Sequence, residues 1–177
     1  MKITKEELIK LDACEEGLNR FITQTNNTDE PVEVSSLVGG ENNYGDLLWL
    51  AGEKLPKDRI VRFACDCALL NIEKIKPYTD KYEIIVKFLS NPTGAGVVAG
   101  VVRLATRAAI RAAAYADVAA ADVAAAAADA ADSAAHAAHT TYAAHTACAV
   151  LAAYAADAAA DAGSRNKVDK LLKELFA

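Results

Sequence analysis

The stretch of sequence that decides the fold reads Ala112-Ala-Ala-Tyr-Ala-Asp-Val-Ala-Ala-Ala-Asp-Val-Ala-Ala-Ala-Ala-Ala-Asp-Ala-Ala131. It lies within a longer segment, from Val97 to Ala162, in which about half of the residues are alanine. This segment contains no proline, and its one glycine is Gly100. Alanine has the highest helix propensity and loses no side-chain entropy in a helix, so the segment is predicted to be helical.

Two arrangements of the alanine-rich segment are open. A single helix would be roughly 95–100 Å long, and it would need a partner because small side chains cover every face. Alternatively, the chain turns at Asp117-Val118, Asp132-Ser133 or Thr140-Thr141, since Asp, Ser and Thr are good N-caps. Small side chains let helix axes approach closely. We favour long helices packed closely as a hairpin or bundle, in a protein that forms an oligomer.

Outside this segment, capping residues and apolar spacing predict shorter helices. Thr4 and Glu7 form a capping box before a helix at 5–11. Asp12 and Glu15 repeat the pattern before a helix that reaches about Thr25. Further helices are predicted at 44–54, 57–76, 81–89 and 167–176.

The predicted fold class is all-α. Val32-Glu-Val34 is too short to claim as more than an edge strand or an extended linker. We divide the chain into an N-terminal helical region (1–92), an alanine-rich helical region (93–162) and a C-terminal amphipathic helix (163–177).

Charge and cysteine content exclude several classes of protein. The formal net charge of −5 argues against binding to nucleic acid and to anionic membranes. Asp or Arg interrupts the alanine-rich segment every few residues, so it is not predicted to span a membrane. The first residues are charged and contain no apolar signal region. Cys65 and Cys67 are interpreted as small core residues of a cytoplasmic protein, because the cysteine spacing matches neither a disulfide framework nor a zinc finger.

An arginine ladder is the first candidate binding site. Arg103, Arg107 and Arg111 are spaced four residues apart, and Tyr115 continues the series on the same helix face. A guanidinium group binds phosphate or carboxylate oxygens with two hydrogen bonds. The ladder therefore predicts either a site for an anionic, nucleotide-type ligand, a solvated polar stripe, or internal pairing with aspartates.

An Asp-His cluster is the second candidate site. Asp132, His136 and His139 follow each other at spacings of four and three, which places them on one helix face. This geometry suits a divalent metal ion such as zinc, although histidines on helix surfaces often bind nothing. We expect no cofactor, and no catalytic constellation stands out, so the protein is not predicted to be an enzyme.

Two segments carry a resemblance to a known family. They are Asp46-Leu-Leu-Trp-Leu50 and Arg59-Ile-Val-Arg-Phe-Ala-Cys-Asp-Cys-Ala68. Together with the alanine-rich helices they resemble a group of small phage and bacterial proteins, including immunity proteins proposed for polymorphic toxin systems. Thr4-Lys-Glu-Glu-Leu8 and Asp12-Ala-Cys-Glu-Glu-Gly-Leu-Asn-Arg-Phe21 resemble the amino terminus of the phage-encoded members.

The resemblance implies a protein of a phage or mobile element that acts by binding in the host bacterial cytosol. Its expected role is immunity or counter-defence through a partner protein. Sequestration of an anionic nucleotide by the arginine ladder is the alternative, and a metal-binding helical protein is the third reading.

Overall fold

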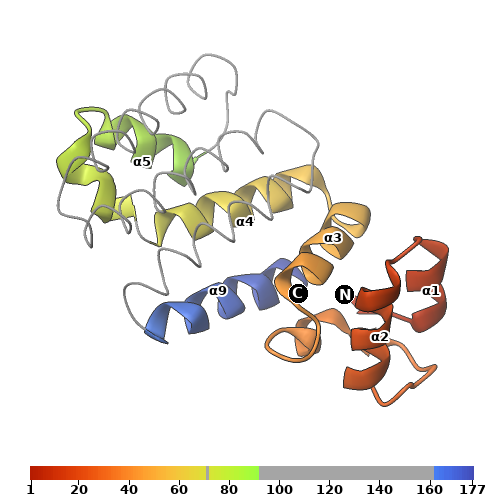
Figure 1. Ribbon diagram of the computed structural model, residues 1–177. Coiled ribbons are helices and arrows are strands. Elements are labelled where there is room, and N and C mark those ends of the chain that lie inside the picture. The colour runs from red at the N-terminus through yellow and green to blue at the C-terminus, as the bar shows by residue number, and fades with distance from the viewer. Residues whose placement is uncertain (71, 92–161) are drawn as a thin grey trace.

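The computed structural model describes residues 1–70, 72–91 and 162–177 (Figure 1). In chain order the described elements are β1 (Lys2–Ile3), α1 (Lys5–Lys10), α2 (Glu15–Gln24), β2 (Val32–Glu33), the 3-10 helix η1 (Val34–Leu37), α3 (Tyr44–Lys54), α4 (Lys57–Leu69), the 3-10 helix η2 (Ile72–Tyr78), α5 (Tyr82–Ser90) and α9 (Ala162–Leu175). Six of these are α-helices, so the described part of the chain is predominantly helical, as the sequence predicts.

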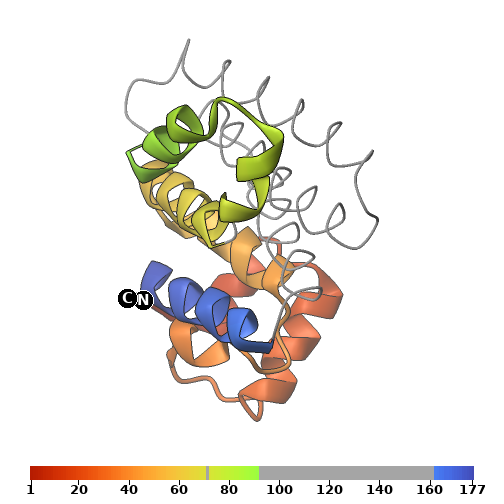
Figure 2. The same ribbon diagram turned by 90° about the vertical axis from the view of Figure 1, so that its left-hand side faces the viewer.

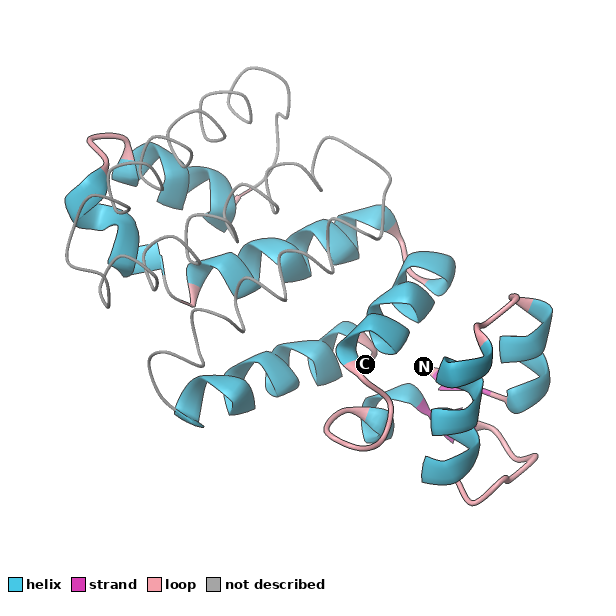
Figure 3. Ribbon diagram, in the orientation of Figure 1, coloured by secondary structure: helices cyan, strands magenta, loops and turns pink. Residues whose placement is uncertain are grey.

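One small sheet accompanies the helices, and its second strand lies in the segment 32–34 that the sequence marks as an edge strand or an extended linker. β1 and β2 pair antiparallel, with Lys2 opposite Glu33 and Ile3 opposite Val32 (Figure 3). Ile3 is buried in the core, which fixes the first residues of the chain against the loop before η1. Strands of two residues are too short to show the alternation by which a strand is recognised in a sequence.

The capping box predicted at the start of α1 is confirmed. The backbone N–H of Glu7 donates to the hydroxyl of Thr4 at 3.2 Å, and the N–H of Thr4 donates to the Glu7 carboxylate at 3.0 Å. That second hydrogen bond is the main reason why the pKa of Glu7 is below its usual value. The predicted helix ends one residue early, at Lys10.

The second predicted capping box is wrong, because Asp12 ends α1 instead of starting α2. Asp12 adopts a left-handed conformation with φ of 60°. The N–H groups of Asp12 and Ala13 donate to the carbonyls of Ile9 and Leu8, each at 3.0 Å, which is the Schellman pattern at a helix end. The N-cap of α2 is Cys14, whose sulfur accepts a hydrogen bond from the N–H of Gly17.

The bounds of α3 match the predicted 44–54. Asn43 and Asp46 form a reciprocal capping box at its start, with N···O distances of 3.0 Å in both directions. Leu55 is extended and Pro56 follows it, so the helix cannot continue into α4. One face of α3 buries Leu47, Leu48 and Leu50.

The helix predicted at 57–76 is shorter than expected. α4 ends at Leu69, and the 3-10 helix η2 contains Pro77. The ring of a proline clashes with the carbonyl four residues earlier in an α-helix, which disfavours an α-helix over residues 73–76. Ile75 of η2 is nevertheless fully buried.

Cys65 and Cys67 are both buried, as predicted. The reason is the position of α4, which contacts α5 and α9 (Figures 1 and 2). Residues two apart on a helix point in nearly opposite directions. Cys67 belongs to the cluster that includes the apolar residues of α9, and Cys65 lies outside that cluster.

The C-terminal helix packs into the same core as the first 70 residues. Val168, Leu172 and Phe176 are fully buried, in one cluster with side chains such as Phe21 and Leu47. Figure 2 shows the two chain ends side by side, and the amino group of Met1 donates to the carbonyl of Phe176 at 2.6 Å. The sequence analysis treats 163–177 as a separate region, but its apolar side chains complete the core of the N-terminal region.

Several sequence predictions lie outside the described residues. They are the arrangement of the alanine-rich helices and the turns proposed within them, all between residues 92 and 161. In the described part of the chain, no helix combines the length and the apolar composition needed to cross a membrane.

Candidate functional site

The residues singled out in the sequence as candidate sites lie outside the described part of the chain. This holds for Arg103, Arg107, Arg111 and Tyr115, and for Asp132, His136 and His139. Within residues 1–70, 72–91 and 162–177, no group of three His, Cys, Asp or Glu side chains is arranged to hold a metal ion. The candidate site of the described region is a different feature, a cavity among the first three helices.

This cavity has a volume of about 330 Å³ and lies where α1, α2 and α3 meet. Its lining residues are Leu8, Asp12, Ala13, Cys14, Gly17, Phe21, Leu37, Asn42, Asn43, Gly45, Asp46, Leu47, Trp49 and Leu50. Most of the wall is apolar, and the volume is at the lower end of the range for sites of small molecules or single side chains. Trp49, the single tryptophan of the chain, is part of this wall.

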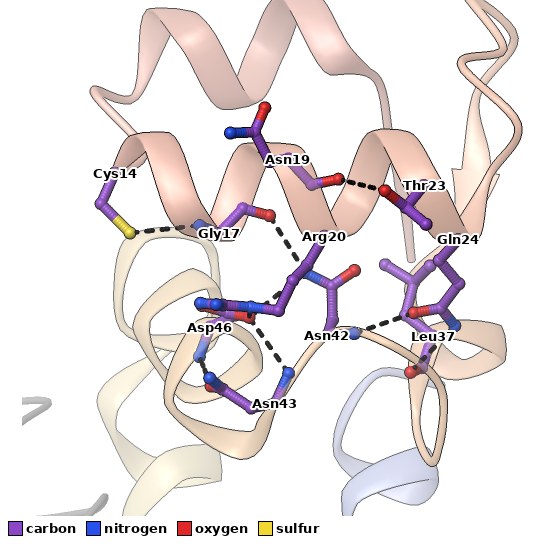
Figure 4. Close-up of polar contacts among 10 residues, drawn as sticks. All are labelled: Cys14, Gly17, Asn19, Arg20, Thr23, Gln24, Leu37, Asn42, Asn43 and Asp46. Atoms are coloured by element: carbon purple, nitrogen blue, oxygen red, sulfur yellow. Dashed lines mark hydrogen bonds and ion pairs between the residues drawn. The ribbon is translucent and has the colours of Figure 1, made fainter.

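An ion pair fixes one side of the cavity (Figure 4). Arg20 of α2 donates to both carboxylate oxygens of Asp46 at 2.7 Å, in the bidentate geometry that suits guanidinium. Burial by itself raises the pKa of Asp46, but hydrogen bonds from Arg20, Asn43 and Asn42 more than offset it. The net effect holds that pKa below its usual 3.8. Asp46 therefore stays ionised and joins α2 to the start of α3.

The loop before α3 is anchored to α2 through Gln24. The Gln24 amide accepts from the N–H of Asn42 at 3.0 Å and donates to the carbonyl of Leu37 at 3.2 Å. Gly40 lies close to the end of the Gln24 side chain: a Cβ added there would be 2.1 Å from the Gln24 nitrogen, so a larger residue would displace this amide. The hydrogen bonds of Gln24 therefore fix the loop that forms this part of the cavity wall.

Asn42 is the buried polar residue of this wall. Its amide nitrogen donates to the carbonyl of Gly17 at 3.3 Å and to Asp46 at 3.4 Å. Its Oδ1 is buried and accepts no hydrogen bond from the described residues. An unpaired buried acceptor destabilises a fold by about 1–3 kcal/mol, so this oxygen is a feature that packing alone does not explain.

Cys14 is an exposed thiol among the residues that line the cavity, whereas Cys65 and Cys67 are buried. Burial raises the pKa of the Cys65 thiol to about 12, although Arg62 partly opposes this effect.

Because the thiolate is the reactive form, we expect N-ethylmaleimide to label Cys14 at least about tenfold faster than Cys65 or Cys67 in the native protein. Peptide mapping by mass spectrometry measures the three rates. Equal labelling of Cys65 before denaturation would contradict the described packing of α4.

A second cleft lies between α4 and α9, with a volume of about 300 Å³. Arg59 donates from it to the carbonyls of Glu174 and Leu175, at 3.3 and 2.7 Å, and so caps the end of α9. Arg62 pairs with Asp66 one helical turn away and donates to the carbonyl of Ser90. Both arginines use their hydrogen bonds to join α4 to neighbouring helices, so we interpret this cleft as a contact between helices and not as a binding site.

Sequence reasoning missed the cavity. Its walls combine residues from position 8 to position 50, and no spacing pattern links Leu8, Phe21 and Trp49. Apolar periodicity does mark these residues as core candidates. It cannot show that three helices leave space where their apolar faces meet.

Comparison with known proteins adds no relative: no family model, curated protein or solved structure matches the chain.

Proposed function

We propose that this chain is a non-enzymatic binding protein of a phage or mobile element, which engages a partner protein in immunity or counter-defence. The observation that carries the binding role is the apolar cavity of about 330 Å³, held open among α1, α2 and α3. Binding energy at protein interfaces concentrates in a few anchor side chains, most often Trp, Tyr or Arg, that fill well-packed pockets. The setting in a phage or mobile element rests on the quoted resemblance.

Four described groups with shifted pKa values serve structural contacts and are not poised for acid–base chemistry. The pKa of Asp46 and that of Glu7 are lowered, so both carboxylates stay charged at neutral pH. The hydrogen bond to Glu73 raises the pKa of Tyr82 to about 12, and burial does the same for Cys65. General acid–base catalysis favours groups whose pKa lies near the working pH, and these four groups are all held away from it.

The test is capture of a partner from an extract of the natural host by the immobilised full-length protein. We expect one protein in stoichiometric amount. A cavity-filling variant, Ala13→Phe, should lose it, while Ile9→Ala, which alters a side chain 56% exposed, should keep it. Light scattering in parallel separates a partner from self-association, since a mass several-fold above 18.6 kDa indicates an oligomer. The proposal fails if the wild type captures nothing above background.

A further inference from the structure

Two of the unused polar groups around the cavity are hydrogen-bond acceptors, on Asp12 and Asn42. Asp12 lines it and is exposed, and no described lysine, arginine or amino terminus pairs with its carboxylate. Asn42 lines it too, with an unpaired Oδ1. The Asn42 oxygen is buried whereas Asp12 is exposed, so Asp12 is the more accessible of these two acceptors.

The cations near the cavity are already engaged. Both Asp46 oxygens are occupied by Arg20, so Arg20 offers no free charge to a ligand. Glu15 and Glu16 add negative charge in the first turn of α2, directly after Cys14. The whole chain has a net charge of −5. The charge that complements this surface is therefore positive.

We infer that the cavity receives a segment of the partner protein in which a large apolar side chain stands directly beside a lysine or arginine. This inference rests on the proposed function and specifies what the partner presents. The apolar side chain packs against Leu8, Phe21 and Trp49, and the neighbouring cation pairs with Asp12. An aromatic anchor fits best, because aromatic side chains bury large area with few rotatable bonds.

Short capped peptides test this on the full-length protein, with the fluorescence of Trp49 as the signal. The probes are acetyl-Ala-Phe-Arg-Ala-amide, its Phe-Glu counterpart and its Ala-Arg counterpart. We expect the Phe-Arg peptide to bind about five- to tenfold more tightly than the Phe-Glu peptide at low salt, since one charge is attracted by Asp12 and the other repelled. The Ala-Arg peptide should lose most of the binding. Higher salt should reduce the preference.

Asp12→Asn is the decisive variant, because asparagine tolerates the left-handed conformation and the fold is retained. The preference for Phe-Arg should fall to about twofold or less. Glu30→Gln, which removes an exposed carboxylate away from the cavity, should leave it unchanged.

Three results would overturn the inference: no peptide binding, equal binding of the Phe-Arg and Phe-Glu peptides, or a preference that survives Asp12→Asn. Binding of free 2-phenylethylamine as tight as that of the Phe-Arg peptide would reassign the cavity to small amines. These titrations need no natural partner, so they are independent of the capture experiment. If Asp12→Asn and Ala13→Phe both capture the partner as well as the wild type does, the proposed function stands but the partner does not use this site.

Discussion

Replacing Phe176 by alanine is expected to lower the free energy of unfolding by about 3–5 kcal/mol, the range for truncating a buried phenylalanine. A residue so close to the end of the sequence would ordinarily fray and tolerate change. Here its side chain is fully buried in the main core cluster. Its carbonyl, which the substitution preserves, accepts from the amino group of Met1. The variant therefore isolates the contribution of the ring.

Urea denaturation followed by Trp49 fluorescence measures this effect, since Trp49 packs against the same cluster. Ile9→Ala is the matched control: it also shortens a large apolar side chain, but one that is 56% exposed. The control should change stability by less than about 1 kcal/mol. A loss below about 1 kcal/mol for Phe176→Ala would contradict the burial of this ring in the core cluster.

Local signals made parts of the fold predictable. The bounds of α3 follow from Asn43, Asp46 and Pro56, which all lie within two residues of the helix or inside it. The capping box of Thr4 and Glu7 joins residues three apart, so the start of α1 is equally predictable from the sequence. Such signals depend on backbone hydrogen bonds between near neighbours. The sequence therefore contains them in full.

Asp12 shows where local signals are ambiguous. Aspartate suits an N-cap, and it also tolerates the left-handed conformation that ends a helix. Which role it takes depends on whether the chain must reverse between α1 and α2, a tertiary requirement. The structure uses Asp12 for the reversal and Cys14 for the cap.

Two further features could not be predicted from the sequence for a related reason: the packing of α9 into the core, and the cavity among the first three helices. The hydrogen bond of Tyr44 to Asp169 joins residues 125 positions apart. The hydrogen bond of Arg59 to the carbonyl of Leu175, at the end of α9, joins residues 116 positions apart. Amphipathic spacing shows that α9 has an apolar face but not which surface covers it. The cavity depends on how three such faces meet, so it became visible only in three dimensions.

Replacing Asp46 by alanine is expected to lower the free energy of unfolding by about 2–4 kcal/mol, because one carboxylate serves both a helix cap and a partly buried ion pair. Its oxygens accept from Arg20, from the N–H of Asn43 and from the amide of Asn42. The Asp46 side chain is 13% exposed, so water cannot fully replace these donors. Glu6→Ala, which breaks the exposed pair with Lys10, should cost about 0.5 kcal/mol or less.

The pH dependence of the Asp46 contribution has a definite sign. The pKa of Asp46 is lower in the folded protein than the usual 3.8, so the unfolded chain takes up a proton first as the pH falls. The stabilisation is therefore complete well above pH 3.8 and is lost as the pH falls through the folded value. Asp46→Asn keeps the shape of the side chain and removes the charge. The stability difference between wild type and Asp46→Asn should be large at neutral pH and smaller at about pH 3. A difference that stays constant over this range would show that the Arg20–Asp46 charge pair does not hold α2 to α3.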